Sequence, residues 1–322
     1  MKKFLSCDWG TSSFRLRLVE TDTFKFSSVE DQEQGILKWF ELWKKSGKEE
    51  QERFFFYRAI IDEYIKKLEQ QLNISLQHIP LIISGMACSS IGMMNLPYKE
   101  IPFHANGSDA EVKKIPAAGD FNHDIIIISG AKKDDDVMRG EETQLAGCTH
   151  DTLNQHIFIF PGTHSKHVTV SNGMVADIRT YMTGEFFELL SKKSILATGV
   201  EEGEGLINLN NKESFELGVS NSLQSNLLHA CFLIRTNELF GKLNKAENYY
   251  YLSGLLIGTE LRELIKKDKV KITLVVDEKM KPFYLTALKI WRIDKDKEYF
   301  KIENASTALI KGQFRIWNYR HF

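Results

Sequence analysis

The sequence predicts an α/β protein made of two layered domains, and two observations lead to that prediction. Apolar runs that end in glycine or another small residue alternate with amphipathic helical segments, which is the pattern of buried strands joined by helices. The chain of 322 residues is also long enough for two domains that each bury a hydrophobic core.

The predicted elements follow one another in a regular order. The opening segment KKFLSCDWGTSSFRLRLVET is typical of a β-hairpin, because Phe14, Leu16 and Leu18 alternate with polar residues after a tight turn. Residues 54–72 have the apolar spacing of a long amphipathic helix. Further buried strands are expected in PLIISGM, DIIIISGA, HIFIFPGT and VKITLVV. Further helices are expected in TGEFFELLSKKSIL, residues 221–239, NYYYLSGLLIGTELRELIKK and LIKGQFRIWNYRHF.

Composition narrows the range of partners. The 42 lysine and arginine residues nearly balance 43 aspartate and glutamate residues, so no overall field attracts nucleic acid or an anionic membrane. No apolar run approaches the roughly 18 residues of a membrane span. The four cysteines lie far apart, which predicts neither a disulfide framework nor a zinc site and fits a cytoplasmic protein. A small-molecule substrate is therefore expected, and the oligomeric state stays open, with a homodimer as one option.

A turn rich in hydroxyl groups follows the first predicted strand. It comes directly after Asp8 and contains Gly10, Thr11 and Ser12. Backbone N–H groups and hydroxyls of a tight turn can donate to phosphate oxygens, and a carboxylate can hold the water shell of a magnesium ion. We therefore expect these residues to bind ATP and Mg²⁺, with Asp8 reaching the metal through water. The competing interpretation is an ordinary hairpin turn.

The same arrangement recurs later in the chain, where Gly162, Thr163, His164, Ser165 and Lys166 lie between a buried strand and an alternating one. Two such hairpins facing each other across a cleft are how actin-like kinases hold a triphosphate, and the lysine would add a positive charge. Neither turn has the spacing of a P-loop or of a GxGxxG loop. The predicted fold is therefore two ribonuclease-H-like domains of the actin-like ATPase type, flanking a nucleotide and substrate cleft.

Acidic residues are concentrated between the two hairpins, in the segment DDDVMRGEETQLAG. Glu141 lies at a predicted helix start shortly before the second hairpin, the place of an acidic residue in sugar kinases. Its carboxylate would accept the proton of the attacking hydroxyl, and Asp8 would contribute through the metal ion. Glu142 is the reserve candidate. A purely structural role is the alternative, because acidic residues are favoured in the first turn of a helix.

Several polar residues near strand ends and helix starts are candidates for binding a polyhydroxy acid. They are Ser89, Ser90, Arg139, Arg179, Thr183 and Glu185. Arg139 or Arg179 would neutralise the carboxylate of the substrate, and Glu185 is a further candidate for the base. The alternatives are an ordinary strand-to-helix turn at residues 84–92 and a helix cap at Thr183.

These segments, taken in order, resemble the 2-dehydro-3-deoxygalactonokinase family. The matching stretches are DWGTSSFRLRL, SGMACSSIG followed by LPY, VMRGEETQLAG, PGTHSKHV, RTYMTGE and LSGLLIGTEL, and they extend from residue 4 to about residue 262. The resemblance implies transfer of the ATP γ-phosphoryl group to the 6-hydroxyl of 2-dehydro-3-deoxy-D-galactonate in D-galactonate breakdown. The chain departs from the family at residues 277–282, where DEKMKP replaces a glycine-containing adenosine loop and would crowd the adenine.

The order of the motifs divides the chain into domains 1–150 and 151–322, with a boundary near 148–156 and the last helix packing back on the first domain. Two rival interpretations remain. One is a kinase of the same fold that acts on another sugar or sugar acid, which a panel of substrates would separate. The other is a degenerate nucleotide-binding regulator, suggested by residues 277–282, which ATP consumption in the presence of an acceptor would exclude.

Overall fold

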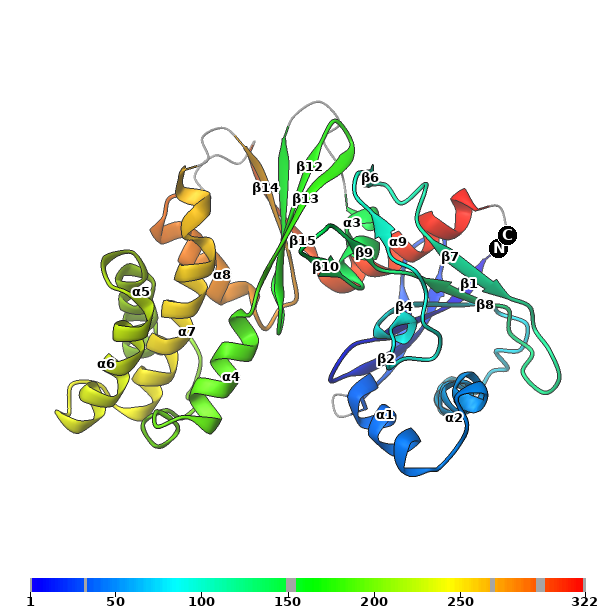
Figure 1. Ribbon diagram of the computed structural model, residues 1–322, viewed down its shortest axis with the longest axis horizontal. Helices are drawn as coiled ribbons and strands as arrows, with labels where there is room; N and C mark the ends of the chain where they lie inside the picture. The colour runs from blue at the N-terminus through cyan, green and yellow to red at the C-terminus, as the bar shows by residue number, and fades with distance from the viewer. Residues whose placement is uncertain (1, 32–33, 149–154, 267–269, 294–298, 321–322) are drawn as a thin grey trace. The chain divides into compact units, whose positions relative to one another are not determined.

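The computed structural model describes residues 2–31, 34–148, 155–266, 270–293 and 299–320 (Figure 1). The chain forms two compact units. The first consists of Met1–Leu153, Thr169–Ile178 and Ala305–Phe322, and the second of Asn154–Val168 and Arg179–Asn304. The boundary predicted near residues 148–156 falls largely outside the described ranges. Thr169–Ile178 and Ala305–Phe322 belong to the first unit although they come late in the sequence, so a single boundary cannot separate the two units.

A six-stranded mixed sheet forms the centre of the first unit, in the order β3-β2-β1-β4-β8-β7. Its strands are β1 (Lys3–Trp9), β2 (Phe14–Glu20), β3 (Phe26–Asp31), β4 (Leu81–Gly85), β7 (Val112–Ile115) and β8 (Ile125–Ile128). β1 and β2 form the predicted antiparallel hairpin, and β4 and β8 continue the sheet parallel to β1. The predicted strands in PLIISGM and DIIIISGA are therefore confirmed.

Helices cover both faces of this sheet because its central strands are apolar on both sides. The helices of the unit are α1 (Ile36–Lys45), α2 (Arg53–Leu72), α3 (Glu141–Gly147) and α9 (Ala305–Tyr319). Leu5 and Cys7 of β1 share one core with α2, and the alternate residue Phe4 packs in a second core with α9. Figure 1 shows α2 and α9 on opposite sides of the sheet. The helices predicted at 54–72 and at the C-terminus are confirmed.

The last helix, α9, also contacts β1, β4 and α3, which carry residues of the candidate site described below. Gln313 of α9 donates from Nε2 to the carbonyl oxygen of Cys7 (3.1 Å) and to Oγ of Ser84 (2.9 Å). A Cβ placed on Gly312 would lie 1.7 Å from the carbonyl oxygen of Thr143, so α9 and α3 pack with their backbones in contact. α9 therefore ties α3 to the middle of the sheet.

A second six-stranded sheet has the order β15-β14-β11-β12-β13-β6. Its strands are β6 (Phe103–His104), β11 (His156–Phe160), β12 (Ser165–Ser171), β13 (Met174–Tyr181), β14 (Lys271–Val276) and β15 (Phe300–Asn304). β14 pairs parallel to β11, and β15 pairs parallel to β14. The order β13-β12-β11-β14-β15 therefore repeats the order β3-β2-β1-β4-β8 of the first sheet. A small third sheet joins β5 (Lys99–Glu100), β9 (Ala131–Lys132) and β10 (Val137–Met138).

The helices of the second unit are α4 (Thr183–Lys193), α5 (Leu209–Gln224), α6 (Leu227–Leu239), α7 (Lys245–Leu261) and α8 (Lys281–Ile290). The helix predicted over 221–239 is confirmed in part: residues 221–224 end α5, and α6 begins after Asn226, which caps it by accepting from the N–H of Leu228 (3.0 Å). α7 is buried at the centre of the unit. A Cβ on its Gly254 would lie 2.0 Å from the carbonyl oxygen of Phe215, which is why α5 can approach it so closely. None of the helices within the described residues is long and apolar enough to cross a membrane.

Candidate functional site

The turn of residues 10–13, the first predicted phosphate turn, joins β1 to β2 and is contacted by the start of α1. The N–H of Ile36 donates to the carbonyl oxygen of Gly10 (3.0 Å), and the N–H of Gly35 donates to that of Ser12 (3.1 Å). The first amides of a helix have no partner within the helix, so this docking satisfies both the helix and the turn. The turn is therefore fixed in shape by α1, a helix that was not among the predicted elements.

Asp8 lies at the carboxyl end of β1, next to β4. Its Oδ2 accepts from Nη1 of Arg15 (3.2 Å), and both side chains are partly exposed. On the other side, its Oδ1 lies 3.6 Å from the position of a Cβ built on Gly85. A Cβ built on Gly140 would in turn lie 3.6 Å from Cα of Gly85. The ends of β1 and β4 and the start of α3 therefore meet at one edge of the first sheet.

Glu141 and Glu142 open α3 directly after Gly140, and their surroundings differ. Glu141 is partly exposed, and its Oε2 accepts from the N–H of Arg139 (3.0 Å). Glu142 is buried, and its oxygens accept from the N–H of Gly140 (2.8 Å) and the hydroxyl of Thr143 (2.9 Å). Burial first, and the charge of Glu141 second, raise the pKa of Glu142 to about 8. The pair thus combines an accessible carboxylate with a buried carboxyl group that is mostly protonated at neutral pH.

The side chain of Arg139 is held in place beside these acids. Its Nε donates to Oη of Tyr98 (2.8 Å), its guanidinium carbon lies 4.2 Å from the centre of the Tyr98 ring, and its Nη1 contacts Sγ of Cys88 (3.5 Å). Of the two serines predicted to bind substrate in the same segment, Ser89 is buried and donates to a backbone carbonyl (2.7 Å), whereas Ser90 is exposed. Arg139 and Ser90 are therefore the more accessible of these candidates.

The turn of residues 161–165, the second predicted phosphate turn, joins β11 to β12. Gly162, Thr163 and His164 are exposed at its surface. Ser165 is buried, and its Oγ accepts from the N–H of Gly162 (3.3 Å). Lys166 is also buried, and its Nζ donates to the carbonyl oxygen of His164 (2.9 Å). Two of the predicted phosphate ligands, Ser165 and Lys166, thus support the turn from inside.

The first turn of α4 packs directly against this second phosphate turn. A Cβ on Gly184 would lie 2.7 Å from both the carbonyl oxygen of Gly162 and Cα of Thr163, so the contact requires a glycine. The N–H of Glu185 donates to the carbonyl oxygen of Thr163 (3.0 Å), and its carboxylate contacts Nε2 of His164 (2.5 Å). Glu185 of α4 therefore contacts this turn through both its backbone and its side chain.

The two remaining predicted substrate residues have different surroundings. Thr183 is the first residue of α4 and not its cap, and its hydroxyl donates to Oε2 of Glu260 (2.5 Å). Arg179 pairs with Glu263 through Nη1 (2.7 Å), and both side chains are about half exposed. Arg179 lies in the second unit, whereas Arg139 lies in the first. The structure therefore does not group the two arginines within one unit.

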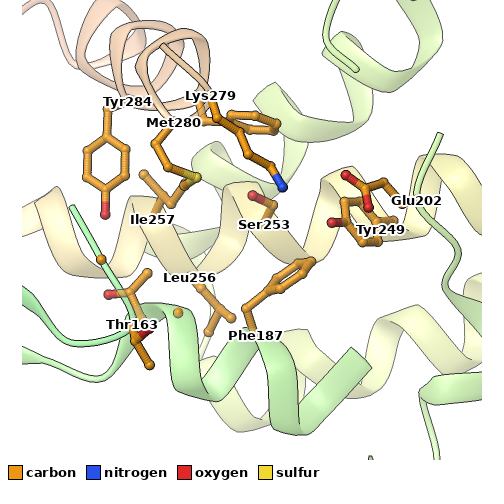
Figure 2. A pocket seen from close by; sticks show the side chains of 14 residues that line it. Thr163, Phe187, Glu202, Tyr249, Ser253, Leu256, Ile257, Lys279, Met280 and Tyr284 are labelled. Atoms are coloured by element: carbon orange, nitrogen blue, oxygen red, sulfur yellow. The ribbon is translucent and has the colours of Figure 1, made fainter. Parts of the chain in front are cut away.

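A pocket of about 320 Å³ lies in the second unit beside the second phosphate turn. Figure 2 shows Thr163 and Tyr284 at one end of this pocket and Glu202 and Tyr249 at the other. Apolar side chains from α4, α7 and α8 form most of the lining between the two ends. The segment 277–282 also contributes to the walls through its Lys279 and Met280.

Few side chains in the described part of the chain are placed to bind a metal ion or to act as a nucleophilic thiol. No group of three His, Cys, Asp or Glu side chains there is placed to hold a metal ion. The thiols of Cys7 and Cys88 are buried, and burial raises the pKa of both. A nucleophilic cysteine is therefore not indicated at either position.

Three side chains that organise these sites were not predicted from the sequence, namely Tyr98, Glu260 and Tyr284. Glu260 is a charged residue within the otherwise apolar helical segment LSGLLIGTEL, and a buried charge must be paired. That position was the one available signal. Tyr98 and Tyr284 carry no such signal, because an aromatic residue in an apolar segment is ordinarily part of the core.

A family profile and two curated relatives are similar to this chain over most or much of its length. The sequence profile of the 2-keto-3-deoxy-galactonokinase family matches residues 8–315. A probable 2-dehydro-3-deoxygalactonokinase of Rhizobium meliloti strain 1021 is 31% identical over 268 residues, which cover 80% of this chain and 79% of that protein. The 2-dehydro-3-deoxygalactonokinase of Escherichia coli strain K12 is 33% identical over 192 residues, which cover 58% of this chain and 61% of that protein.

A solved structure that is similar over almost the whole chain gives the same family name. It is a Sinorhizobium meliloti protein assigned as a 2-dehydro-3-deoxygalactonokinase, with a TM-score of 0.78 and 27% identity over 98% of this chain and 96% of that one. The predicted actin-like sugar-kinase fold is thereby confirmed.

Proposed function

Because the chain belongs to the 2-keto-3-deoxy-galactonokinase family, we propose that it transfers the γ-phosphoryl group of ATP to the 6-hydroxyl of 2-dehydro-3-deoxy-D-galactonate, a step of D-galactonate breakdown. The observation that carries the proposal is the convergence of Asp8, Gly85 and Gly140 at one edge of the first sheet, with Glu141 directly after Gly140 at the start of α3. The expected location is the reducing cytoplasm.

The pocket of the second unit is the proposed site for the adenosine part of ATP. Its volume of about 320 Å³ is at the lower end of the roughly 300–1,000 Å³ typical of ligand pockets. Its apolar lining suits a base, and the exposed backbone of Gly162 and Thr163 at one end suits phosphates. The first turn of α4 adds the positive end of a helix dipole beside the same backbone. The segment 277–282 thus forms part of the adenosine site, with Lys279 and Met280 in place of small residues.

The residues around Asp8 fit a magnesium ion. Mg²⁺ prefers oxygen ligands, keeps several of its waters and is usually held by one or two carboxylates together with substrate phosphates. Asp8 offers such a carboxylate, with the hydroxyl-bearing residues Thr11 and Ser12 close by in the turn. A bound magnesium ion would supply charge neutralisation for the transferred phosphoryl group.

Glu141 is the proposed general base. It is partly exposed at the meeting point of β1, β4 and α3, where its carboxylate can accept a proton from an acceptor hydroxyl. Glu142 is turned into the protein, and both of its oxygens already accept hydrogen bonds. We assign Glu142 to holding the helix start, because its raised pKa of about 8 leaves it mostly protonated near neutral pH.

Arg139 is the proposed partner for the carboxylate of the sugar acid. Its contacts with Tyr98 and Cys88 fix the guanidinium near the Glu141 segment, and a pre-oriented arginine binds a carboxylate at low entropic cost. Arg179 is already paired with Glu263 on the surface. Of the two arginines, Arg139 is therefore the better candidate.

Initial rates of ADP release with Mg-ATP and a panel of acceptors test the proposal. The panel contains 2-keto-3-deoxy sugar acids, glucose, glycerol and xylulose. The keto sugar acids should exceed every neutral acceptor in kcat/KM by at least about tenfold, because a charged site left unpaired costs on the order of a few kcal/mol. A neutral sugar with the highest kcat/KM would indicate another kinase of this fold. Absence of ADP release with every acceptor would favour a nucleotide-binding regulator.

A further inference from the structure

The carboxylate of Glu260, near the end of α7, is about 1% exposed and is the centre of a buried hydrogen-bond network. Nε2 of His167 lies 3.1 Å from Oε1, and the hydroxyls of Thr183 and Tyr284 donate to Oε2 at 2.5 and 2.8 Å. These three donors come from β12, α4 and α8. Burying a carboxylate is costly unless hydrogen bonds replace its hydration, and these three contacts replace it here. Glu260 therefore joins three elements around the pocket to α7.

The network continues from Tyr284 to the second phosphate turn. Oη of Tyr284 lies 3.0 Å from Oγ of Ser165, and Oγ of Ser165 accepts from the N–H of Gly162 (3.3 Å). Burial first, and the charge of Glu260 second, raise the pKa of Tyr284 well above its usual value, so its hydroxyl keeps its proton.

The direction of each hydrogen bond follows from this protonation. Tyr284 has one proton and gives it to the carboxylate of Glu260, so Ser165 is the donor to Tyr284. A competing contact from Oγ of Ser165 to the carbonyl oxygen of Gly162 is longer, at 3.5 Å. The donors therefore run in one direction, from the amide of Gly162 through two hydroxyls to Glu260.

We propose, on the premise of the kinase function above, that Ser165, Tyr284 and Glu260 are positioning residues that set the shape of the second phosphate turn. Ser165 does not bind phosphate itself in this arrangement, because it is buried and its proton is donated to Tyr284. The phosphates are instead bound by the exposed part of the turn. This role differs from the direct phosphate contact that the sequence pattern predicts for Ser165.

Calorimetric titration with ATP and with adenosine tests this role. Tyr284→Phe and Ser165→Ala each remove one hydroxyl of the network, and the double variant removes both. The matched control is Tyr251→Phe. Tyr251 is also a buried tyrosine, lies on the same helix as Glu260 and accepts from Nδ2 of Asn221 (3.0 Å), away from the pocket lining.

Each single variant should weaken ATP binding about 3- to 30-fold, the range set by the loss of one or two buried hydrogen bonds. Adenosine has no phosphate, and phenylalanine keeps the ring with which Tyr284 lines the pocket, so the Kd for adenosine should stay within about twofold of wild type in both variants. The double variant should lose no more than the worse single variant, because both substitutions break one chain of donors. Tyr251→Phe should leave both constants unchanged.

Several results would overturn the role. Weaker ATP binding in Ser165→Ala with an unchanged Kd in Tyr284→Phe would show that Ser165 contacts phosphate directly. A lower melting temperature with unchanged ATP and adenosine constants would show a purely structural network. If Tyr284→Phe does not fold, Glu260→Gln takes its place with the same expected loss of ATP affinity. A wild-type protein that binds no ATP at all would instead contradict the proposed kinase function.

Discussion

Replacing Glu142 by glutamine should stabilise the fold at alkaline pH and change it little at acidic pH. Burial raises the pKa of this carboxyl group from 4.5 to about 8. The folded protein therefore holds the proton more tightly than the unfolded chain does. The contribution of this group to stability is complete below pH 4.5 and is lost progressively as the pH rises to about 8.

The size of the effect follows from the two pKa values. Between them, each pH unit costs the folded state about 1.4 kcal/mol. Glutamine has the same shape, its Oε1 can accept from the N–H of Gly140, its Nε2 can donate to the hydroxyl of Thr143, and it does not ionise. We therefore expect the free energy of unfolding of Glu142→Gln, relative to wild type, to rise by about 2–4 kcal/mol between pH 5 and pH 8.5.

Urea denaturation followed by circular dichroism at pH 5, 7 and 8.5 measures this difference. The control is Glu63→Gln, a change of the same chemistry on the exposed face of α2, which should differ from wild type by a constant amount at all three pH values. Parallel pH profiles for wild type and Glu142→Gln would refute the assignment of a buried, protonated carboxyl group to this position.

Three further predictions concern activity. Glu141→Gln should lower kcat by about 10²–10⁴-fold, the usual cost of losing a general base, with an unchanged Kd for ATP by calorimetry. Full activity of Glu141→Gln together with loss of activity in Glu142→Gln would show that Glu142 is the base instead. Arg139→Ala should raise KM for the keto sugar acid by about tenfold or more, because a charge-assisted contact is lost, and leave KM for ATP unaltered. Its control is Arg58→Ala on α2, which removes an ion pair with Asp120 and ring contacts with Phe55 and Phe121. Asp8→Asn should increase the Mg²⁺ concentration needed for half-maximal rate by about tenfold, and an unchanged magnesium titration would remove Asp8 from the metal site.

Much of the architecture could be predicted because it depends on local periodicity. The period of two in β1 and β2, the uninterrupted apolar runs of β4, β8, β11 and β14, and the period of α2 are all visible in short windows of sequence. The break between α5 and α6 was missed because apolar spacing continues through residues 221–239 while one cap, Asn226, starts a new helix. The contact of α1 with the turn of residues 10–13 is made by backbone amides, so it could not be predicted from residue types.

The composition of the two turns led to the prediction of two phosphate sites, which stays a prediction. In the structure Gly162 and Thr163 of the second turn line the pocket, but the internal contacts of the site could not be predicted. Whether Ser165 points outward or inward depends on Tyr284, which lies 119 residues away in the chain. The partners of Glu260 lie 24, 77 and 93 residues from it, so no window of sequence contains the network. Contacts of this kind follow from tertiary packing and were therefore absent from the predicted site.

Phosphorus NMR of the reaction product tests the central claim most directly. The purified protein is incubated with Mg-ATP and 2-dehydro-3-deoxy-D-galactonate until the γ-phosphate signal of ATP disappears. The account predicts a phosphomonoester signal coupled to the two protons of a CH₂ group, as expected for phosphorylation of the 6-hydroxyl, in an amount equal to the ADP formed. Release of inorganic phosphate alone, or a phosphoester coupled to a single CH proton, would contradict it.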